Sequence, residues 1–127
     1  MENLKGKVSP WHLLEMVRMT ARLDSAGAAT ELMKKQKLPA NFQGWAQLEI
    51  YLAELARAKD RVDSAAVEDV GAKGSLPRAL AWEAWARHNT RVGYREEVLK
   101  AAREQEDPAI RSMLYLGAAL GSQDRER

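Results

Sequence analysis

Cysteine is absent from the chain, and histidine is scarce, with two residues among 127. Without cysteine the protein forms no disulfide and offers no thiolate metal ligand or cysteine nucleophile. Long apolar runs are missing too, because the longest uncharged stretch, 112–123, is shorter than the roughly 20 residues of a membrane-spanning helix. The first residues also lack the apolar run of a secretory signal. We therefore expect a cytoplasmic protein without a membrane segment.

A strong charge of one sign is also missing from the sequence. Twenty lysine and arginine residues are offset by 18 aspartate and glutamate residues, which leaves a net charge of +2. Neither half of the chain is strongly polarised. The overall charge therefore gives little support to nucleic-acid binding, and any such function must rest on a local pattern.

What the sequence has in excess is helix-forming residues. Alanine and leucine dominate, whereas valine, isoleucine and threonine are few. A chain of this length is too short to build two cores that each bury enough apolar surface. The sequence predicts an all-α fold, a compact bundle of about five helices in a single domain, or six helices if the first is broken.

Proline and the small polar residues mark the expected helix boundaries. Ser9-Pro10, Ser75-Leu76-Pro77 and Asp107-Pro108 are typical of an N-cap followed by the first helical turn, and Asn41 is a candidate cap. Gly121 is expected to be the last C-cap. The helices are expected at 10–36, 41–62, 77–88, 94–105 and 108–120. Breaks at 24–27, 63–64 and 89–93 stay open, and the second helix could extend to Val70. Around the helical domain, 10–121, we expect an N-terminal extension, 1–9, and a flexible tail, 122–127.

Two apolar patterns indicate which faces are buried. On the first helix, opposite Glu15, Arg18 and Arg22, the apolar residues cluster on one arc that is expected to face the core; they are Leu13, Leu14, Met16, Val17, Ala21 and Leu23. The second helix carries a narrow stripe with 3–4–3 spacing, which is also expected in the core; its members are Trp45, Leu48, Leu52 and Leu55.

Enzymatic sites find little support. Neither histidine follows a glutamate by three residues, as a di-iron helical bundle requires. His88 is expected to be a hydrogen-bonded histidine at the edge of the core. Adjacent acids such as Glu96-Glu97 point about 100° apart on a helix, so they do not converge as an acid/base pair would. We predict no catalytic residue, no cofactor and no metal ion.

The last helix favours a role in protein interaction. Its residues 113–120 are apolar almost all round, so it either lies at the centre of the domain or forms part of an oligomer interface. The candidate interface residues on it are Tyr115, Gly117 and Gly121, since glycines four residues apart allow a second backbone to approach. Trp11, on the polar side of the first helix, is either an exposed aromatic anchor or packed against a loop. The sequence thus predicts a non-enzymatic interaction or assembly protein that binds a protein partner or itself, as a homo-oligomer.

The alternative function is nucleic-acid binding. Within the segment 64–90, residues 66–84 resemble a helix-turn-helix, with a short helix, Gly71 at the turn and a second helix that opens at Ser75. The sequence departs from that motif in two ways: the spacing from Gly71 to Ala79-Leu80 is one residue short of the commonest pattern, and Pro77 is unusual inside a recognition helix. The resemblance implies a small helical nucleic-acid-binding protein or ribonucleoprotein subunit. Its expected phosphate contacts are Arg78, Arg87, Arg91 and Arg95.

Overall fold

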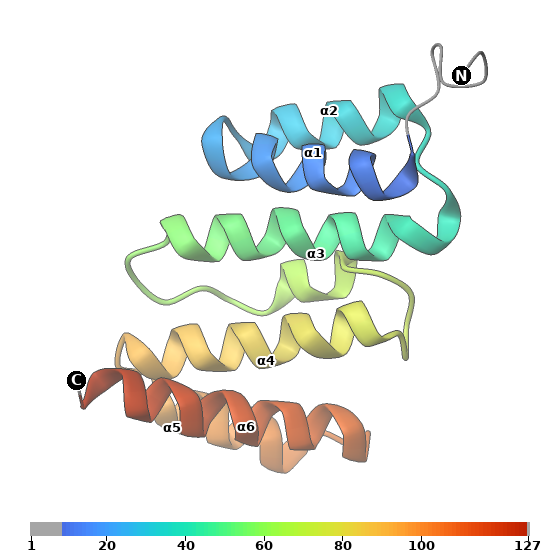
Figure 1. Ribbon diagram of the computed structural model, residues 1–127. Coiled ribbons are helices and arrows are strands. Elements are labelled where there is room, and N and C mark those ends of the chain that lie inside the picture. The colour runs from blue at the N-terminus through green and yellow to red at the C-terminus, as the bar shows by residue number, and fades with distance from the viewer. Residues whose placement is uncertain (1–8, 127) are drawn as a thin grey trace, which may run out of the picture.

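The computed structural model describes residues 9–126, which form helices joined by short connections and contain no strand (Figure 1). The elements are α1 (Pro10–Leu23), α2 (Ala26–Gln36), α3 (Ala40–Arg57), the 3-10 helix η2 (Ala65–Asp69), α4 (Leu76–Arg91), α5 (Arg95–Glu104) and α6 (Pro108–Arg125). The all-α prediction is confirmed, with six α-helices in the described residues because the first predicted helix is broken. Residues 1–8 and 127, parts of the predicted extension and tail, lie outside the described residues.

The helices are stacked in layers (Figure 1). The pair α1 and α2 lies at one end, α3 comes next, η2 and α4 follow, and α5 and α6 form the other end. The most extensive contact between two helices joins α4 and α6. The first and last helices of the described chain therefore lie at opposite ends of the stack.

Capping explains most of the helix starts. The side chains of Ser9, Ser25 and Asp107 accept hydrogen bonds from backbone N–H groups two or three residues further on, at 3.2, 3.0 and 2.9 Å. The possible break at 24–27 is present, because Ser25 is the N-cap of a new helix, α2. The prediction of Asn41 as a cap is wrong: Pro39 holds that position without a side-chain hydrogen bond, and Asn41 lies in the first turn of α3.

Two apolar clusters hold the layers together. The smaller joins α1, α2 and α3 through residues such as Leu13, Val17 and Ala46. The larger joins α3, η2, α4, α5 and α6, and includes Trp82 and Trp85, whose rings meet edge to face at 5.6 Å. The stripe on α3 is confirmed: two of its members are buried and two are half-buried against the larger cluster, namely Leu48, Leu55, Trp45 and Leu52.

The central helix is α4, which differs from the prediction. The sequence pointed to 108–120 or 41–62 as the helix covered on all sides. Instead α4 contacts α3, η2, α5 and α6 and buries eight residues, three of them polar. The sequence did not indicate that α4 is buried, because three of its buried residues are polar: His88, Asn89 and Thr90.

The second predicted helix is also shorter than expected. It ends at Arg57 rather than at Val62 or Val70, and residues 58–64 run without helix to η2. The backbone of this segment finds its hydrogen-bond partners on α4: the Asn89 side chain accepts from the N–H of Val62 and donates to its carbonyl, at 2.9 and 2.8 Å. These side-chain bonds give the N–H and carbonyl groups of Val62 the partners that a helix would otherwise provide.

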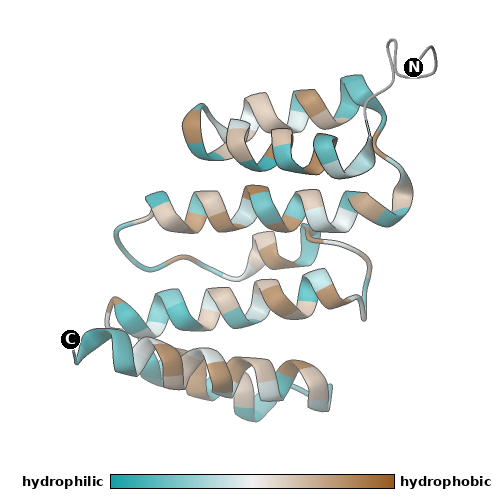
Figure 2. Cartoon of the chain, viewed as in Figure 1, coloured by the Kyte–Doolittle hydropathy of each residue, from teal (hydrophilic) through white to brown (hydrophobic). Residues whose placement is uncertain are grey.

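The predicted end of the last helix is wrong. α6 continues through Gly121 to Arg125, so Gly121 is not a C-cap and 122–125 are not a separate tail. Figure 2 shows hydrophobic residues along the middle of α6. The last turns are held by Asp124, whose carboxylate accepts two hydrogen bonds from Arg87 of α4, at 2.8 and 3.1 Å.

Replacement of Gly117 or Gly121 tests the contact between α4 and α6. A Cβ at Gly117 would lie 2.4 Å from the carbonyl oxygen of Glu83, and one at Gly121 would lie 2.5 Å from that of Arg87. We expect Gly117→Ala and Gly121→Ala each to lower the free energy of unfolding by about 1–3 kcal/mol, since backbone cannot move aside cheaply. Gly27→Ala, in α2 with only Ser25 Oγ near at 3.9 Å, is the control and keeps or raises stability. Urea unfolding midpoints equal to wild type for both α6 variants would contradict the close packing.

Candidate functional site

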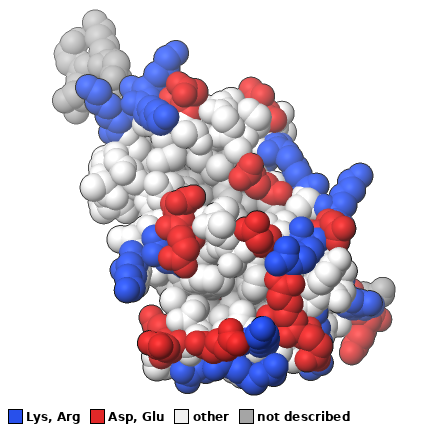
Figure 3. All heavy atoms as spheres, turned by 180° about the vertical axis from the view of Figure 1, so that it is seen from behind, with Lys and Arg blue, Asp and Glu red and all other residues white. Residues whose placement is uncertain are grey.

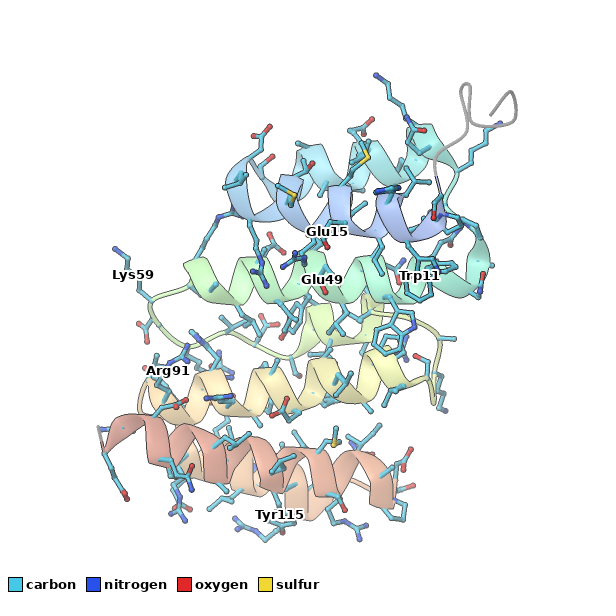
Figure 4. All side chains as sticks on the ribbon, viewed as in Figure 1. Trp11, Glu15, Glu49, Lys59, Arg91 and Tyr115 are labelled. Carbon is cyan, nitrogen blue, oxygen red and sulfur yellow. The ribbon has the colours of Figure 1, made fainter. Side chains whose placement is uncertain are left out.

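The two aromatic residues predicted as interface anchors lie far apart: Trp11 is beside the start of α3, and Tyr115 is on α6 at the end of the stack (Figure 4). Trp11 is 70% exposed, and its ring packs edge to face with that of Phe42 of α3, at 4.8 Å between centroids. Tyr115 is exposed on α6 beside Leu116. The structure therefore leaves both aromatic rings accessible but does not bring them together.

The two glycines predicted at that interface have another role. Gly117 and Gly121 are buried, and the space beside each is filled by α4. They allow close approach of two helices, as expected, but both helices belong to the same chain. The prediction of Gly117 and Gly121 as contacts with a partner is therefore wrong, because α4 leaves no room for another backbone.

The sequence did not indicate an exposed row on α1 that consists of one histidine and three apolar residues. His12, Met16, Met19 and Leu23 follow 4–3–4 spacing, so they share one face of α1, and all four are exposed. We call this row the methionine stripe. The prediction that Met16 and Leu23 face the core is wrong, since the buried row of α1 is Leu13, Val17 and Ala21. From periodicity alone, α1 has one wide apolar arc. In the structure α2 and α3 cover one row of this arc and leave the other row exposed.

Arg78 is not available to a phosphate. Its guanidinium donates to the carbonyl oxygens of Val70 at 3.1 Å and Gly71 at 2.8 Å, and to Glu68 through both the backbone and the side chain. The helix-turn-helix geometry is also absent: η2 is a five-residue 3-10 helix, and α4 is covered on several sides. What resembled a recognition helix is the centre of the fold.

The other three arginines do not combine into a basic surface. Arg87 and Arg91 both lie beside Asp124, at 2.8 and 3.8 Å, and Arg95 lies 3.8 Å from Glu96. On the face shown in Figure 3, acidic and basic residues are interspersed. Nucleic-acid binding thus stays a prediction from the sequence, without the local concentration of positive charge that phosphate binding needs.

A groove of about 680 Å³ lies between α2, α3 and η2. Its floor is the α3 face made by Gln43, Gln47, Ile50, Tyr51 and Glu54. One wall comes from α2 and the turn after it, with Met33, Lys34, Lys37 and Leu38, and the other from η2 and its end, with Ala66, Asp69 and Val70. We call it the Tyr51 groove. Its volume is within the range of small-ligand and peptide sites.

Tyr51 is the unusual polar residue of this groove. It is 5% exposed, and its hydroxyl is buried without a hydrogen-bond partner. Burial, with a smaller effect of the Asp63 and Glu54 carboxylates, raises the pKa of the Tyr51 hydroxyl. The group therefore stays neutral and keeps one donor proton and its acceptor lone pairs unused.

Side chains of α4 hold the chain on both sides of the η2 wall: Arg78 donates to Glu68, Val70 and Gly71, and three further side chains hold residues 60–62. Trp85 Nε1 donates to the Val62 carbonyl at 2.8 Å, in addition to the two bonds from Asn89. His88 Nε2 lies 2.7 Å from the carbonyl oxygen of Asp60, so this nitrogen carries the proton and Nδ1 accepts from Arg91 at 3.2 Å. The prediction of His88 as a hydrogen-bonded histidine at the core is confirmed.

The chain matches no family model, and neither a curated protein nor a solved structure is significantly similar to it. Over residues 9–126, no cluster of three or more histidine, aspartate or glutamate side chains could hold a metal ion. No helix of the described part is long and apolar enough to cross a bilayer. The candidate sites are therefore the methionine stripe, the Tyr51 groove and the exposed side of α6 around Tyr115.

Loss of the Asn89 side chain tests how the groove wall is held. Asn89→Ala leaves the Val62 N–H without its partner, and a buried unsatisfied N–H costs about 1–3 kcal/mol. We expect the free energy of unfolding to fall by that amount. Asn41→Ala, an exposed asparagine at the start of α3, is the matched control and stays within about 0.5 kcal/mol of wild type. Equal urea midpoints for Asn89→Ala and wild type would refute this role.

Proposed function

We propose that the chain is a small, non-enzymatic interaction protein that binds an amphipathic helix of a protein partner through the methionine stripe on α1. The supporting observation is the exposure of that stripe: Leu23 is 80% exposed, Met19 49% and Met16 42%. A row of large apolar side chains left open to water is unfavourable unless a partner covers it. Methionine suits such a surface because its flexible thioether adapts to different partners.

The shape and charge of the stripe support a helix as its occupant. Spacing of 4–3–4 gives the row that two packed helices present to each other. The adjacent side of α1 carries Arg18 and Arg22 against a single acid, Glu15, which pairs with Arg18. An acidic flank on the partner helix would complement this excess of positive charge.

The electrostatics of the chain support a non-enzymatic role. Shifted carboxyl pKa values belong mostly to ion pairs: the hydrogen bond from Arg18 lowers the pKa of Glu15, and that from Arg61 lowers the pKa of Glu97. Both pairs lie on the surface and outside the groove. Such shifts are typical of structural salt bridges rather than of a poised acid and base.

Self-association is the second form of the proposal. Tyr115 and Leu116 expose apolar surface on α6, at the end of the stack opposite to α1. A second copy could use that surface, and a two-fold dimer is the commonest way to close such a contact. Because the two surfaces are far apart in the stack, substitutions on one leave the other intact.

The experiment compares capture by three forms of the chain in extracts of the cells that produce it, with and without nuclease. We expect wild type and Tyr115→Glu to retain a common protein partner that nuclease does not release. Met16→Glu/Met19→Glu should recover at least about tenfold less of it, because two charges in a desolvated helix contact are strongly unfavourable. Exposed positions keep the fold, which the urea midpoints of all three forms verify.

Three outcomes decide between the alternatives. Partner recovery equal in wild type and Met16→Glu/Met19→Glu contradicts the stripe as the binding surface. Light scattering that shows a dimer lost in Tyr115→Glu favours self-association through α6. Recovery that nuclease abolishes favours nucleic-acid binding and overturns the proposed protein interaction.

A further inference from the structure

We propose that the Tyr51 groove binds a second, separate ligand: a short amphipathic α-helix whose amino-terminal end lies at Tyr51 and Glu54 and whose carboxyl-terminal end lies at Lys34 and Lys37. This inference does not depend on the methionine stripe. It rests on the length of the groove, its apolar side chains, the unpartnered hydroxyl and the order of its charges.

The length of the groove fits three turns of helix. Its floor on α3 extends from Gln43 to Glu54, which is about 16 Å at the rise of an α-helix. A helix of about eleven residues has this length. The α2 wall runs antiparallel to α3, because a short turn joins the two helices, and so it follows the floor over the same distance.

Apolar side chains from both walls and from the floor line the groove. Ile50 lies on the floor, Met33 and Leu38 come from the α2 side, and Val70 comes from the end of η2. A row of two or three apolar side chains at i, i+3 or i+4, and i+7 on the ligand helix would meet these residues. Burial of such a row provides the driving force for binding.

One end of the groove offers acceptors. Glu54 and Tyr51 lie one turn apart near the C-terminal end of α3, next to Ala66 of η2. The first turn of any helix has N–H groups without intrahelical partners and a partial positive charge. The exposed Glu54 carboxylate would accept hydrogen bonds from these N–H groups, and the buried Tyr51 hydroxyl would accept one once the side chains that cover it move aside on binding.

The other end offers cations. Lys34 and Lys37 lie one turn apart at the C-terminal end of α2, beside the N-terminal end of α3. Neither lysine forms an ion pair with any residue from 9 to 126. Unpaired carbonyl groups and acidic side chains at the end of a ligand helix would find donors in these two ammonium groups. Lys34, Lys37 and Glu54 thus set the direction of the ligand helix, parallel to α2; Asp69 of η2 is the one further charged residue in the lining.

The probe is a displayed library of twelve-residue helical peptides with three fixed leucines at i, i+4 and i+7 and variable charged positions at both ends. Selection uses the full chain, and the best peptide is synthesised and its Kd measured by fluorescence anisotropy. We expect acidic residues to be enriched in the last turn of the peptide and not in the first. The contact is also mapped by amide chemical shifts, which should change along α2, α3 and η2.

Three variants test the assignment. Lys34→Glu/Lys37→Glu should weaken peptide binding at least tenfold, whereas Lys35→Glu, an exposed neighbour outside the groove, should leave the Kd within twofold. Tyr51→Phe should weaken binding about three- to tenfold, the usual effect of one lost hydrogen bond. The same substitution removes a buried unsatisfied hydroxyl, so its urea midpoint should equal or exceed that of wild type. Weaker binding without weaker folding separates a ligand contact from a structural role.

Other outcomes overturn the inference. They are a library that yields no binder, enrichment of acids in the first turn, and a Kd unchanged within twofold in both groove variants. Preferential binding of a small amphiphile such as anilinonaphthalene sulfonate, displaced by no peptide, would assign the groove to a different ligand class. Loss of peptide binding in Met16→Glu/Met19→Glu would place the peptide on the methionine stripe instead; that variant therefore distinguishes the two proposals.

Discussion

The reciprocal hydrogen-bonded pair between Asn89 and Val62 is the constraint on which the rest of the structure depends. One buried amide side chain replaces the partners that a helix would give to the N–H and carbonyl groups of Val62, and Trp85 and His88 add contacts to the carbonyls of Val62 and Asp60. α4 is therefore central both because its hydrogen bonds hold this segment and because its apolar residues form part of the larger cluster. The chain between α3 and α4 stays extended, and η2 lies against α3 as a short wall instead of a full helix.

The Tyr51 groove is open because η2, which forms one of its walls, is only five residues long. A helix continued to Val70, the longer of the two ends that the sequence allowed, would not return along α3, and the face of Ile50 and Tyr51 would have a different cover. In the observed arrangement η2 covers only part of that face. The buried polar end of α4 thus connects the packing of the core with the surface that is available to a ligand, although none of its residues lines that surface.

Sequence patterns predicted the features that depend on local chemistry. The helix starts at Pro10 and Pro108, the all-α class and the buried stripe on α3 follow from capping, propensity and spacing. They could not separate the two apolar rows of α1, because only contact with α2 and α3 makes one row internal. The sequence also predicted a helix end at Gly121, which is wrong. A glycine at which a neighbouring helix packs closely cannot be distinguished in the sequence from a C-cap glycine. The Tyr51 groove is composed of three distant segments and has no signature in the sequence.

Native-state hydrogen exchange is the most direct test of this account. The N–H groups of Val62 and Gly71 lie outside any helix, yet each donates to a side chain, Asn89 at 2.9 Å and Gln47 at 2.8 Å. If these bonds fix the segment as described, both amides exchange as slowly as those of the α4 core, through global unfolding. If the segment moves independently, both exchange at rates typical of an open loop, and the chain around η2 is not held by α3 and α4 as described.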